Sequence, residues 1–272
     1  MSDALKNASI ALIGAGNMGL AMLEGWASQG ARGTGVAVVE PNPSQRLRDL
    51  CAVHGFALTG GAGARDAVIL AVKPQMLEAG AEAAAPFVGE RSVVVSILAG
   101  KRVEDIAARL PAAGAVVRAM PNTPAAIGRG MTGAFASPGT KDSQRLLADA
   151  LLRAAGQVEW VDSEALIDAV TAVSGSGPAY VFLLVECLAA AGVEAGLPKE
   201  LAERLARATV EGAGELLHRQ PETSAETLRQ RVTSPGGTTA AALGVLMADD
   251  GLAPLMARAV GAARKRAAEL SG

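Results

Sequence analysis

The sequence predicts an α/β fold, in which a doubly wound sheet of parallel strands is followed by an all-α domain. Up to Asp162, short β-branched runs alternate with amphipathic or alanine-rich stretches. Continuous apolar strands that alternate with helices are typical of a parallel sheet covered on both faces. After Asp162 the valine runs stop and long segments of Ala, Leu, Glu and Arg begin. We therefore expect two domains, residues 1–162 and 163–272.

Each strand is expected at a short apolar run, and each helix at a segment with helical periodicity. The expected strands are Ile10–Ile13, Val36–Val39, Val68–Val72, Val93–Ile97, Ala115–Ala119, Met131–Ala136 and Gln157–Val161. Helices among them are expected at Leu20–Gln29, Ser44–His54 and Val103–Leu110. In the second domain, helices are expected at Glu164–Thr171, Pro178–Glu194, Pro198–Arg219, Ala225–Val232, Thr239–Ala248 and Leu252–Leu270.

Three glycines separate the first strand from the first helix. Gly14, Gly16 and Gly19 have the G-x-G-x-x-G spacing. The first glycine allows a sharp turn, the second lets the backbone approach a pyrophosphate, and the third lets the helix pack close to the sheet. The helix N-terminus then presents free N–H groups to the phosphates. In this context the motif predicts a dinucleotide-binding domain of the Rossmann type. The rival interpretation is a plain strand-to-helix turn.

The second strand ends at Glu40, about 20 residues past the glycines, where such folds place the acceptor for the adenosine ribose. A carboxylate there binds ribose hydroxyls and repels a 2′-phosphate, which favours NADH. Arg46 follows closely and is able to reach a phosphate, so NADPH stays open. The alternative is that both residues are exposed loop charges.

Three more strand ends are expected at the same edge of the sheet, because ligands of these folds bind outside the carboxyl ends of the strands. They are Ala71-Val72-Lys73-Pro74, Ser96 to Gly100, and Met120-Pro121-Asn122-Thr123-Pro124. Lys73 at the rim of a crevice suits contact with the cofactor better than base catalysis. We expect Asn122 to lie near the nicotinamide.

The helix expected at Pro178–Glu194 is apolar nearly all round, and such a helix is buried on all sides. A small helical domain provides few partners for it, so we predict a homodimer built on this domain. The alternative is a central helix in a monomeric bundle.

Two glycine-rich segments precede helices in the second domain. Ser174 and Ser176 are expected as caps of the apolar helix, although a tight helix junction explains that segment equally well. Thr233-Ser-Pro-Gly-Gly-Thr-Thr239 makes a turn and then starts a helix with unpaired N–H groups and two hydroxyls. This second segment predicts a pocket for a small carboxylate.

Composition narrows the class of protein. The chain has 272 residues, a net charge of −2, one Tyr and four Phe, which gives no electrostatic or stacking case for nucleic acid or an anionic membrane. The isolated Cys51 and Cys187 predict neither disulfides nor a metal site. No signal peptide or membrane span is expected, so we predict a cytoplasmic enzyme.

Taken together, the motifs resemble those of the pyrroline-5-carboxylate reductase family over nearly the whole chain. They are Gly14-Ala-Gly-Asn-Met-Gly19, Ala71-Val-Lys-Pro74, Arg118-Ala-Met-Pro-Asn-Thr-Pro-Ala125, Val173-Ser-Gly-Ser-Gly-Pro-Ala-Tyr180 and Val232-Thr-Ser-Pro-Gly-Gly-Thr-Thr239. The first motif is common to many dehydrogenases, whereas the last three in this order are specific to the family.

The resemblance implies a Rossmann domain, a helical dimerisation domain whose copies interleave, and further assembly of dimers into a ring. It implies reduction of 1-pyrroline-5-carboxylate to L-proline by NADPH or NADH, the last step of proline biosynthesis. The expected cofactor contacts are Ile13, Gly14, Ala15, Gly16, Asn17, Met18, Glu40, Ala71, Val72, Lys73, Pro74, Ile97, Ala99 and Asn122. The expected substrate contacts are Ser176, Glu222, Gly237, Thr238 and Thr239.

The chain departs from the family at two places. Glu40 replaces a small hydroxyl residue that family members often have near a 2′-phosphate, and Pro221-Glu222-Thr223-Ser224 lacks a His-Pro pair often found there.

The expected chemistry needs little acid catalysis, because the imine is able to arrive already protonated. The N–H groups of Gly237, Thr238 and Thr239 are expected to hold the substrate carboxylate, and the Thr239 hydroxyl to bond the ring nitrogen. A β-hydroxyacid-type dehydrogenase is the runner-up, but it needs a lysine in the helical domain, and neither Lys199 nor Lys265 is well placed. A binding protein that senses nucleotides without turnover leaves the Thr233–Thr239 turn unexplained.

Overall fold

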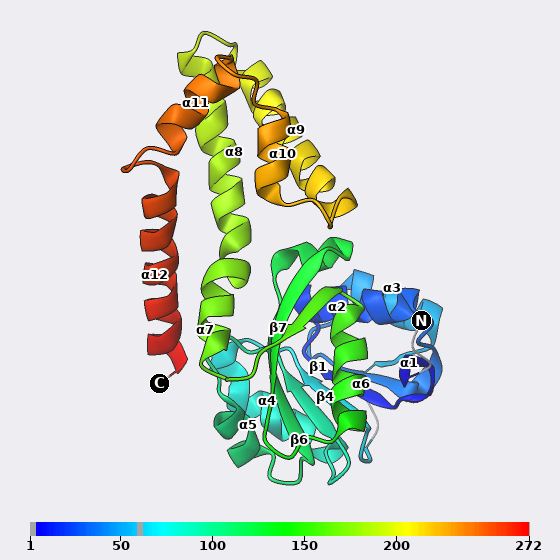
Figure 1. The fold of residues 1–272 in the computed structure, drawn as a ribbon. Helices are drawn as coiled ribbons and strands as arrows, with labels where there is room; N and C mark the ends of the chain where they lie inside the picture. Colours follow the sequence, from blue (N-terminus) through cyan, green and yellow to red (C-terminus); the bar gives the residue numbers. More distant parts are fainter. Residues whose placement is uncertain (1–3, 59–61, 272) are drawn as a thin grey trace. The chain divides into compact units, whose positions relative to one another are not determined.

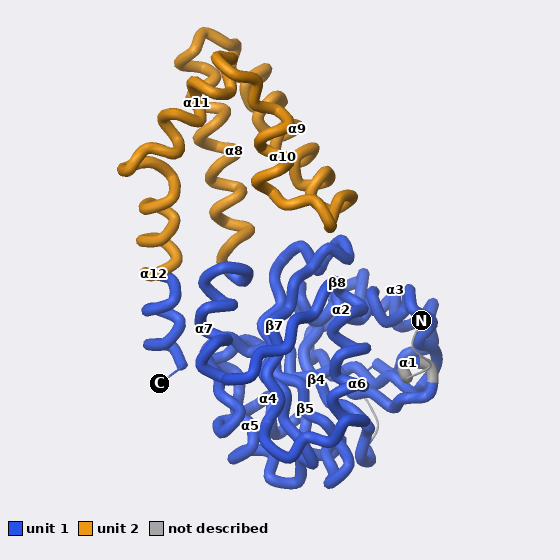
Figure 2. The backbone as a smooth tube through the Cα atoms, viewed as in Figure 1, with its two compact units in different colours: residues 1–175, 263–272 blue, residues 176–262 orange. Residues whose placement is uncertain are grey.

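The computed structural model describes residues 4–58 and 62–271. These form two compact units, residues 1–175 together with 263–272, and residues 176–262 (Figure 2). The C-terminal part of the last helix therefore belongs to the first unit. The division of function expected between residues 1–162 and 163–272 stays a prediction.

The first unit contains a sheet of eight described strands in the order β3-β2-β1-β4-β5-β6-β7-β8 (Figure 1). The strand bounds are β1 Ile10–Ile13, β2 Val36–Val39, β3 Ala57–Leu58, β4 Ala67–Leu70, β5 Val93–Ser96, β6 Ala115–Met120, β7 Gly130–Ala136 and β8 Gly156–Trp160. Strand β1 lies beside both β2 and β4, and its parallel register aligns Ile13 with Val39 on one side and with Leu70 on the other. Strands β1, β2 and β4 therefore end at the same level of the sheet. Between β1 and β4 the strand order changes direction, because β2 and β3 lie on one side of β1 and the later strands lie on the other.

Helices cover both faces of the sheet. Their bounds are α1 Ala4–Asn7, α2 Asn17–Ser28, α3 Gln45–His54, α4 Leu77–Ala84, α5 Val103–Arg109, α6 Asp142–Arg153 and α7 Leu166–Val170. Alternate residues of β1 enter different cores: Ile10 and Leu12 pack with Trp26 of α2, while Ile13 packs with Leu77 of α4. The indole N–H of Trp26 donates to the carbonyl of Leu151 at 2.9 Å, so α2 and α6 are joined on one face.

Two strands, β7 and β8, run against the prediction of an all-parallel sheet. Strand β7 is antiparallel to β6, while β8 is parallel to β7. Only the short 3₁₀ segment Thr123–Ile127 joins β6 to β7, and a parallel pair needs a crossover of about a dozen residues or more. The connection therefore forces the reversal.

The second unit is entirely helical in its described residues. Helices α8 Gly177–Glu194 and α9 Lys199–Arg219 pack as an antiparallel pair and are followed by α10 Ala225–Arg231, α11 Thr238–Leu246 and the first part of α12 Leu252–Ser271 (Figure 1). The six helices predicted after Asp162 are all present. A π-helical turn at Thr171–Gly175 joins α7 to α8.

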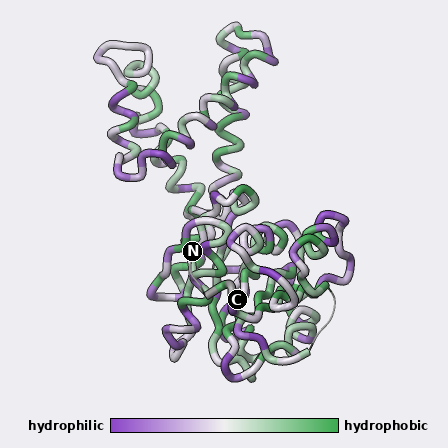
Figure 3. Tube along the Cα trace, turned by 90° about the vertical axis from the view of Figure 1, so that its right-hand side faces the viewer, coloured by the Kyte–Doolittle hydropathy of each residue, from purple (hydrophilic) through white to green (hydrophobic). Residues whose placement is uncertain are grey.

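Helix α8 is not buried within a single chain, which agrees with the prediction of a homodimer and disfavours a central helix in a monomeric bundle. Of its residues only Ala189 is buried, whereas Phe182 is 61% exposed and Leu184 is 50% exposed. Hydrophobic residues run along the helices of this unit as well as through the sheet (Figure 3). The helical run Leu166–Glu194 is long and apolar enough to cross a membrane by length and composition alone, a property that core helices of soluble proteins share.

Candidate functional site

A cavity of about 350 Å³ lies at the carboxyl ends of β1, β2 and β4. Such a position, where the strand order reverses, is where doubly wound folds bind their ligands. The cavity is lined by Ile13, Gly14, Gly16, Val39, Glu40, Pro41, Asn42, Ala71, Val72, Lys73, Met76, Ala79, Gly80 and Ala83. The structure thus brings together the glycine-rich turn, Glu40 and the Ala71–Lys73 strand end, as the sequence predicted.

The three glycines of the turn have different surroundings. Gly14 has a φ of +88°, and a Cβ there would lie 2.9 Å from the backbone of Ala71. A Cβ on Gly19 would lie 2.4 Å from the carbonyl oxygen of Gly14. A Cβ on Gly16 would meet nothing within 4 Å. The first and third glycines are therefore required by packing, while the second faces open space that a ligand is able to fill.

The N-terminus of α2 is suited to an anion. Gly16 is its N-cap and provides no side-chain cap, so no cap side chain occupies the first-turn N–H groups. Asn17 and Met18, two of the expected cofactor contacts, begin this helix. The N–H groups and the positive end of the helix dipole favour a phosphate here. Ala15 also belongs to this turn, directly beside the cavity.

Glu40 is fixed by the backbone. Its Oε2 accepts a hydrogen bond from the N–H of Ala15 at 2.9 Å, and its Oε1 accepts one from the N–H of Asn42 at 3.1 Å. Each oxygen retains a lone pair for a ribose hydroxyl. Arg46 instead forms an ion pair with Glu24 at 2.6 Å, so the structure does not direct it toward a phosphate.

Some lining residues escaped the sequence analysis. Pro41 and Asn42 follow Glu40, while Met76, Ala79, Gly80 and Ala83 come from the turn and helix after Lys73. A Cβ on Gly80 would lie 2.8 Å from Cγ2 of Val72, so this glycine allows α4 to pack against the strand end. The small residues of α4 are the signal in the sequence that points to such close packing.

Seven expected cofactor residues do not line this cavity: Ala15, Asn17, Met18, Pro74, Ile97, Ala99 and Asn122. Ile97 continues from β5 and donates its N–H to the carbonyl of Leu70. The Asn122 side chain accepts from the N–H of Met131 at 2.8 Å and donates to the carbonyl and hydroxyl oxygens of Ser174 at 3.2 Å. The amide therefore holds its own loop, and its role beside the nicotinamide stays a prediction.

The expected substrate residues of the second unit lie at helix ends. Gly237 is the N-cap of α11 without a side-chain cap, and its N–H donates to the carbonyl of Ser234 at 3.1 Å. Thr238 and Thr239 form the first turn, with Thr239 half-buried and Thr238 exposed. Glu222 is exposed in the turn between α9 and α10.

The expectation that serine side chains cap α8 is wrong. Ser176 is the N-cap residue, but its side chain makes no capping bond, because its backbone is already in the right-handed helical region. Ser174 accepts from Asn122 instead. The segment is part of a continuous helical run through the π-helical turn, so its first N–H groups need fewer caps.

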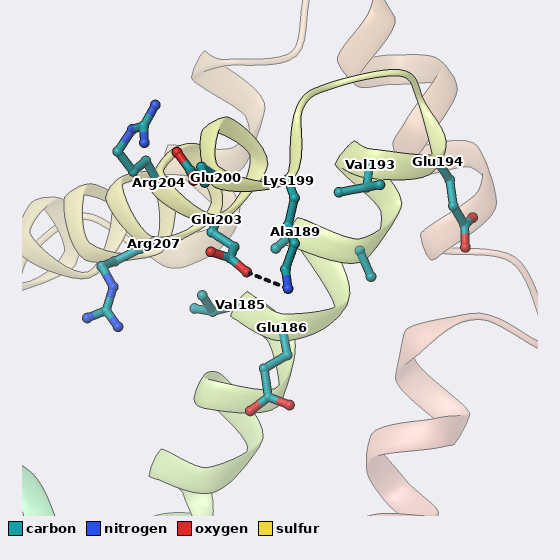
Figure 4. Close-up of a pocket in the computed structure, with 11 residues that line it drawn as sticks. Val185, Glu186, Ala189, Val193, Glu194, Lys199, Glu200, Glu203, Arg204 and Arg207 are labelled. Atoms are coloured by element: carbon teal, nitrogen blue, oxygen red, sulfur yellow. Dashed lines mark ion pairs between the residues drawn. The ribbon is translucent and has the colours of Figure 1, made fainter.

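A second, larger cavity of about 920 Å³ lies between α8 and α9 (Figure 4). It combines the apolar Val185, Ala189 and Val193 with charged side chains of α9. Lys199 pairs with Glu203 at 3.9 Å, and its side chain is 80% exposed. These contacts give Lys199 no feature that marks it as the acid–base lysine of a β-hydroxyacid-type dehydrogenase.

Other nucleophilic or metal chemistry finds little support. Burial raises the pKa of the Cys51 thiol, which disfavours the reactive thiolate. Among the described residues no group of three or more His, Cys, Asp or Glu side chains is placed to hold a metal ion.

A glycine turn that leaves room for a pyrophosphate, beside a carboxylate fixed at the end of β2, defines a Rossmann-type dinucleotide-binding protein. Comparison with known families agrees for both parts of the chain. Residues 9–100 match a family described as NADP oxidoreductase, coenzyme F420-dependent, and residues 164–270 match one described as pyrroline-5-carboxylate reductase dimerisation.

Individual relatives extend the match to almost the full length. A pyrroline-5-carboxylate reductase of Pseudomonas aeruginosa is 41% identical over 96% of each chain. The solved structure of such a reductase from Coxiella burnetii has 38% identity and a TM-score of 0.88 over 97% of this chain and 99% of that one. The chain therefore belongs to the pyrroline-5-carboxylate reductase family. A Plasmodium falciparum structure titled as a pyrroline carboxylate reductase with NADP bound shares the fold, with a TM-score of 0.79, 24% identity and coverage of 98% and 99%.

Proposed function

We propose that this protein reduces 1-pyrroline-5-carboxylate to L-proline with a hydride from NADH or NADPH, the last step of proline biosynthesis. The near full-length identity of 41% to the Pseudomonas aeruginosa reductase carries the proposal. The test is the initial rate of nicotinamide oxidation with 1-pyrroline-5-carboxylate, measured in parallel with both cofactors. Turnover is expected, and its absence with both cofactors contradicts the assignment.

The nicotinamide supplies the hydride that reduces the C=N bond at C5. The cofactor fits the site because the second glycine faces open space, the first turn of α2 is uncapped, and the Glu40 carboxylate lies beside the cavity. Gly14 to Met18 would hold the pyrophosphate, and Glu40 the adenosine ribose. Ala71 to Pro74, Ile97, Ala99 and Asn122 complete the proposed cofactor contacts.

The substrate is held by the second unit in this proposal. The N–H groups of Thr238 and Thr239 bind its carboxylate at the start of α11, where a helix N-terminus favours an anion. The Gly237 N–H, which donates to the Ser234 carbonyl in this structure, would exchange that partner for the substrate. The Thr239 hydroxyl bonds the ring nitrogen, which carries the proton that makes C5 electrophilic. Ser176 and Glu222 are further proposed contacts. Catalysis then consists mainly of orientation and placement of charge.

Glu40 is proposed to make NADH the preferred cofactor. In this proposal the 2′-phosphate of NADPH would come close to the Glu40 carboxylate, and juxtaposed negative charges repel. We expect the wild-type protein to favour NADH, and Glu40→Ser to shift the ratio of kcat/KM values toward NADPH by about tenfold. Parallel steady-state assays with both cofactors measure this ratio. Glu78→Gln, which removes an exposed carboxylate on α4, is the matched control, and an NADPH preference in the wild type would contradict the proposal.

The family forms oligomers through its helical domain, as the matched description states. We propose that residues 1–162 bind the dinucleotide, and that residues 163–272 dimerise and bind substrate. The apolar residues that α8 leaves exposed would be covered by a second copy. Further assembly of dimers into a ring, a cytoplasmic location, and the lack of nucleic-acid or membrane partners belong to the same proposal.

Phe182→Glu is expected to convert the dimer to monomer. Phe182 is 61% exposed in one chain, and a charge buried without a partner at an interface is strongly unfavourable. Light scattering after size exclusion should show the molar mass of one chain. Leu146→Glu, at a 67% exposed leucine on α6, serves as control and should leave the mass unchanged. An unchanged mass for Phe182→Glu would place the interface elsewhere.

A further inference from the structure

Arg118 begins the family motif that ends at Ala125, yet the proposed function gives it no role. The residue lies on β6 and is only 4% exposed. Its Nη1 pairs with Oε1 of Glu164 at 3.3 Å, and its Nη2 pairs with Oδ1 of Asp168 at 3.1 Å. Nη2 also donates to the hydroxyl of Ser271 at 3.2 Å. The charge is thus shared among partners that lie 46 to 153 residues away in the sequence.

The partners of Arg118 also hold the loop that follows β5. Oε1 of Glu164 accepts the N–H of Val103, the first residue of α5, at 2.8 Å. At the other side of the loop, Gly100 has a φ of +70°, and a Cβ there would lie 2.8 Å from the carbonyl oxygen of Leu270. Leu270 directly precedes Ser271, whose hydroxyl is within 3.2 Å of the Asp168 carboxylate. Glu164 therefore bonds the backbone at the end of the loop of residues 97–102, and Gly100 within the loop packs closely against Leu270.

All of these residues belong to the first unit, which includes the C-terminal end of α12 (Figure 2). Asp168 precedes the point where the chain leaves this unit, and Ser271 follows the point where the chain returns. Arg118 therefore binds both the segment by which the chain leaves the first unit, at Asp168, and the segment by which it returns, at Ser271. Through Glu164 it is also linked to the start of α5. A buried ion pair contributes little net stability compared with apolar side chains in its place. Its better documented role is to fix one arrangement of the segments that it joins.

We propose that Arg118 is a positioning residue for the cofactor. Through Glu164 and Ser271 it fixes the loop that carries Ile97 and Ala99. Because this loop is already ordered, binding of the dinucleotide does not lose conformational entropy there. The proposal rests on the proposed function in one respect, since that function assigns Ile97 and Ala99 to the cofactor.

Arg118 itself is a poor target for mutation, because its loss leaves two carboxylates without their partner and endangers folding. Glu164 offers a sharper comparison. Glu164→Ala removes the acceptor for the Val103 N–H, whereas Glu164→Gln keeps an acceptor oxygen and loses only the charge. Ser271→Ala weakens the link to the C-terminal segment. Glu269→Ala removes an exposed ion pair of the same helix and is the matched control.

The experiment measures the Kd of NADH and of NADPH from nucleotide fluorescence, together with kcat, KM and Tm. We expect Glu164→Ala to raise the Kd and the cofactor KM about tenfold, with kcat within about twofold of the wild type, because one charge-assisted hydrogen bond is lost. Glu164→Gln should restore most of the affinity. Ser271→Ala should raise the Kd about threefold, and Glu269→Ala should leave it unchanged.

The outcomes separate this proposal from the proposed function. A lower Tm with unchanged Kd in Glu164→Ala would mean that the cluster only stabilises the fold, which overturns the proposal. Equal losses of affinity in Glu164→Ala and Glu164→Gln would exclude the link through Val103. If the wild-type protein binds dinucleotide but does not reduce the imine, the proposed function fails, and the Kd values still decide the role of the Arg118 cluster.

Discussion

Thr239→Ala is expected to lower kcat/KM for 1-pyrroline-5-carboxylate by ~10–10³-fold, the loss that follows removal of one positioned hydrogen bond to a reacting group. Thr239 lies in the first turn of α11, directly after an N-cap glycine with no side-chain cap. Its side chain is half-buried, which limits competition from water. Steady-state kinetics at saturating cofactor give the value.

Two further substitutions at this position isolate the hydroxyl. Thr239→Ser keeps the hydroxyl and should recover most of the activity, whereas Thr239→Val keeps the shape and should behave like alanine. The Kd for the cofactor should be the same in all three variants, because Thr239 is not a proposed cofactor contact. An unchanged kcat/KM in Thr239→Ala and Thr239→Val would remove this residue from the mechanism.

Gly16→Val is expected to raise the Kd for NADH and NADPH at least ~100-fold while the protein stays folded. Gly16 has a φ of −66° and a ψ of −170°, an extended conformation that any residue adopts, and a Cβ there meets nothing within 4 Å. The added side chain would instead occupy the space proposed for the pyrophosphate, where close backbone approach is needed. Fluorescence titration and thermal melting measure the two effects.

Comparison with other glycines sharpens this prediction. Gly35→Val alters the opposite end of β2 and should leave dinucleotide binding intact. Gly19→Ala should lower Tm instead, because its Cβ would lie 2.4 Å from a carbonyl oxygen. If Gly16→Val bound cofactor as tightly as the wild type, the cavity at the ends of β1, β2 and β4 would not be the pyrophosphate site.

Local pattern predicted most of the fold. Strands β1 and β2 have the bounds expected from their apolar runs, and the six helices after Asp162 are all present. Strand β3, Ala57–Leu58, was missed because two residues carry no periodicity. The reversal of β7 was missed for a different reason. The sequence of a buried strand is apolar in either direction, and the direction of β7 is determined only by the short connection through Thr123–Ile127.

The site was predictable where its residues follow strand ends, and less so where it depends on distant partners. Gly14, Glu40 and Lys73 were placed by the rule that ligands bind at the carboxyl ends of parallel strands. The bonds of Asn122 to Met131 and Ser174 were not foreseen, because an amide in a loop gives no sign of its partners. The convergence of Glu164, Asp168 and Ser271 on Arg118 likewise depends on long-range packing that no local pattern records.

The exposed apolar side of α8 makes the stability of this protein a function of its concentration. In the proposed dimer a second copy covers this surface, which is left to water in the separated chain, so unfolding of the assembly releases subunits and follows mass action. Dilution then favours the unfolded chain, and the melting temperature rises as protein is added. For this chain a single free energy of unfolding has meaning only when the concentration is stated with it.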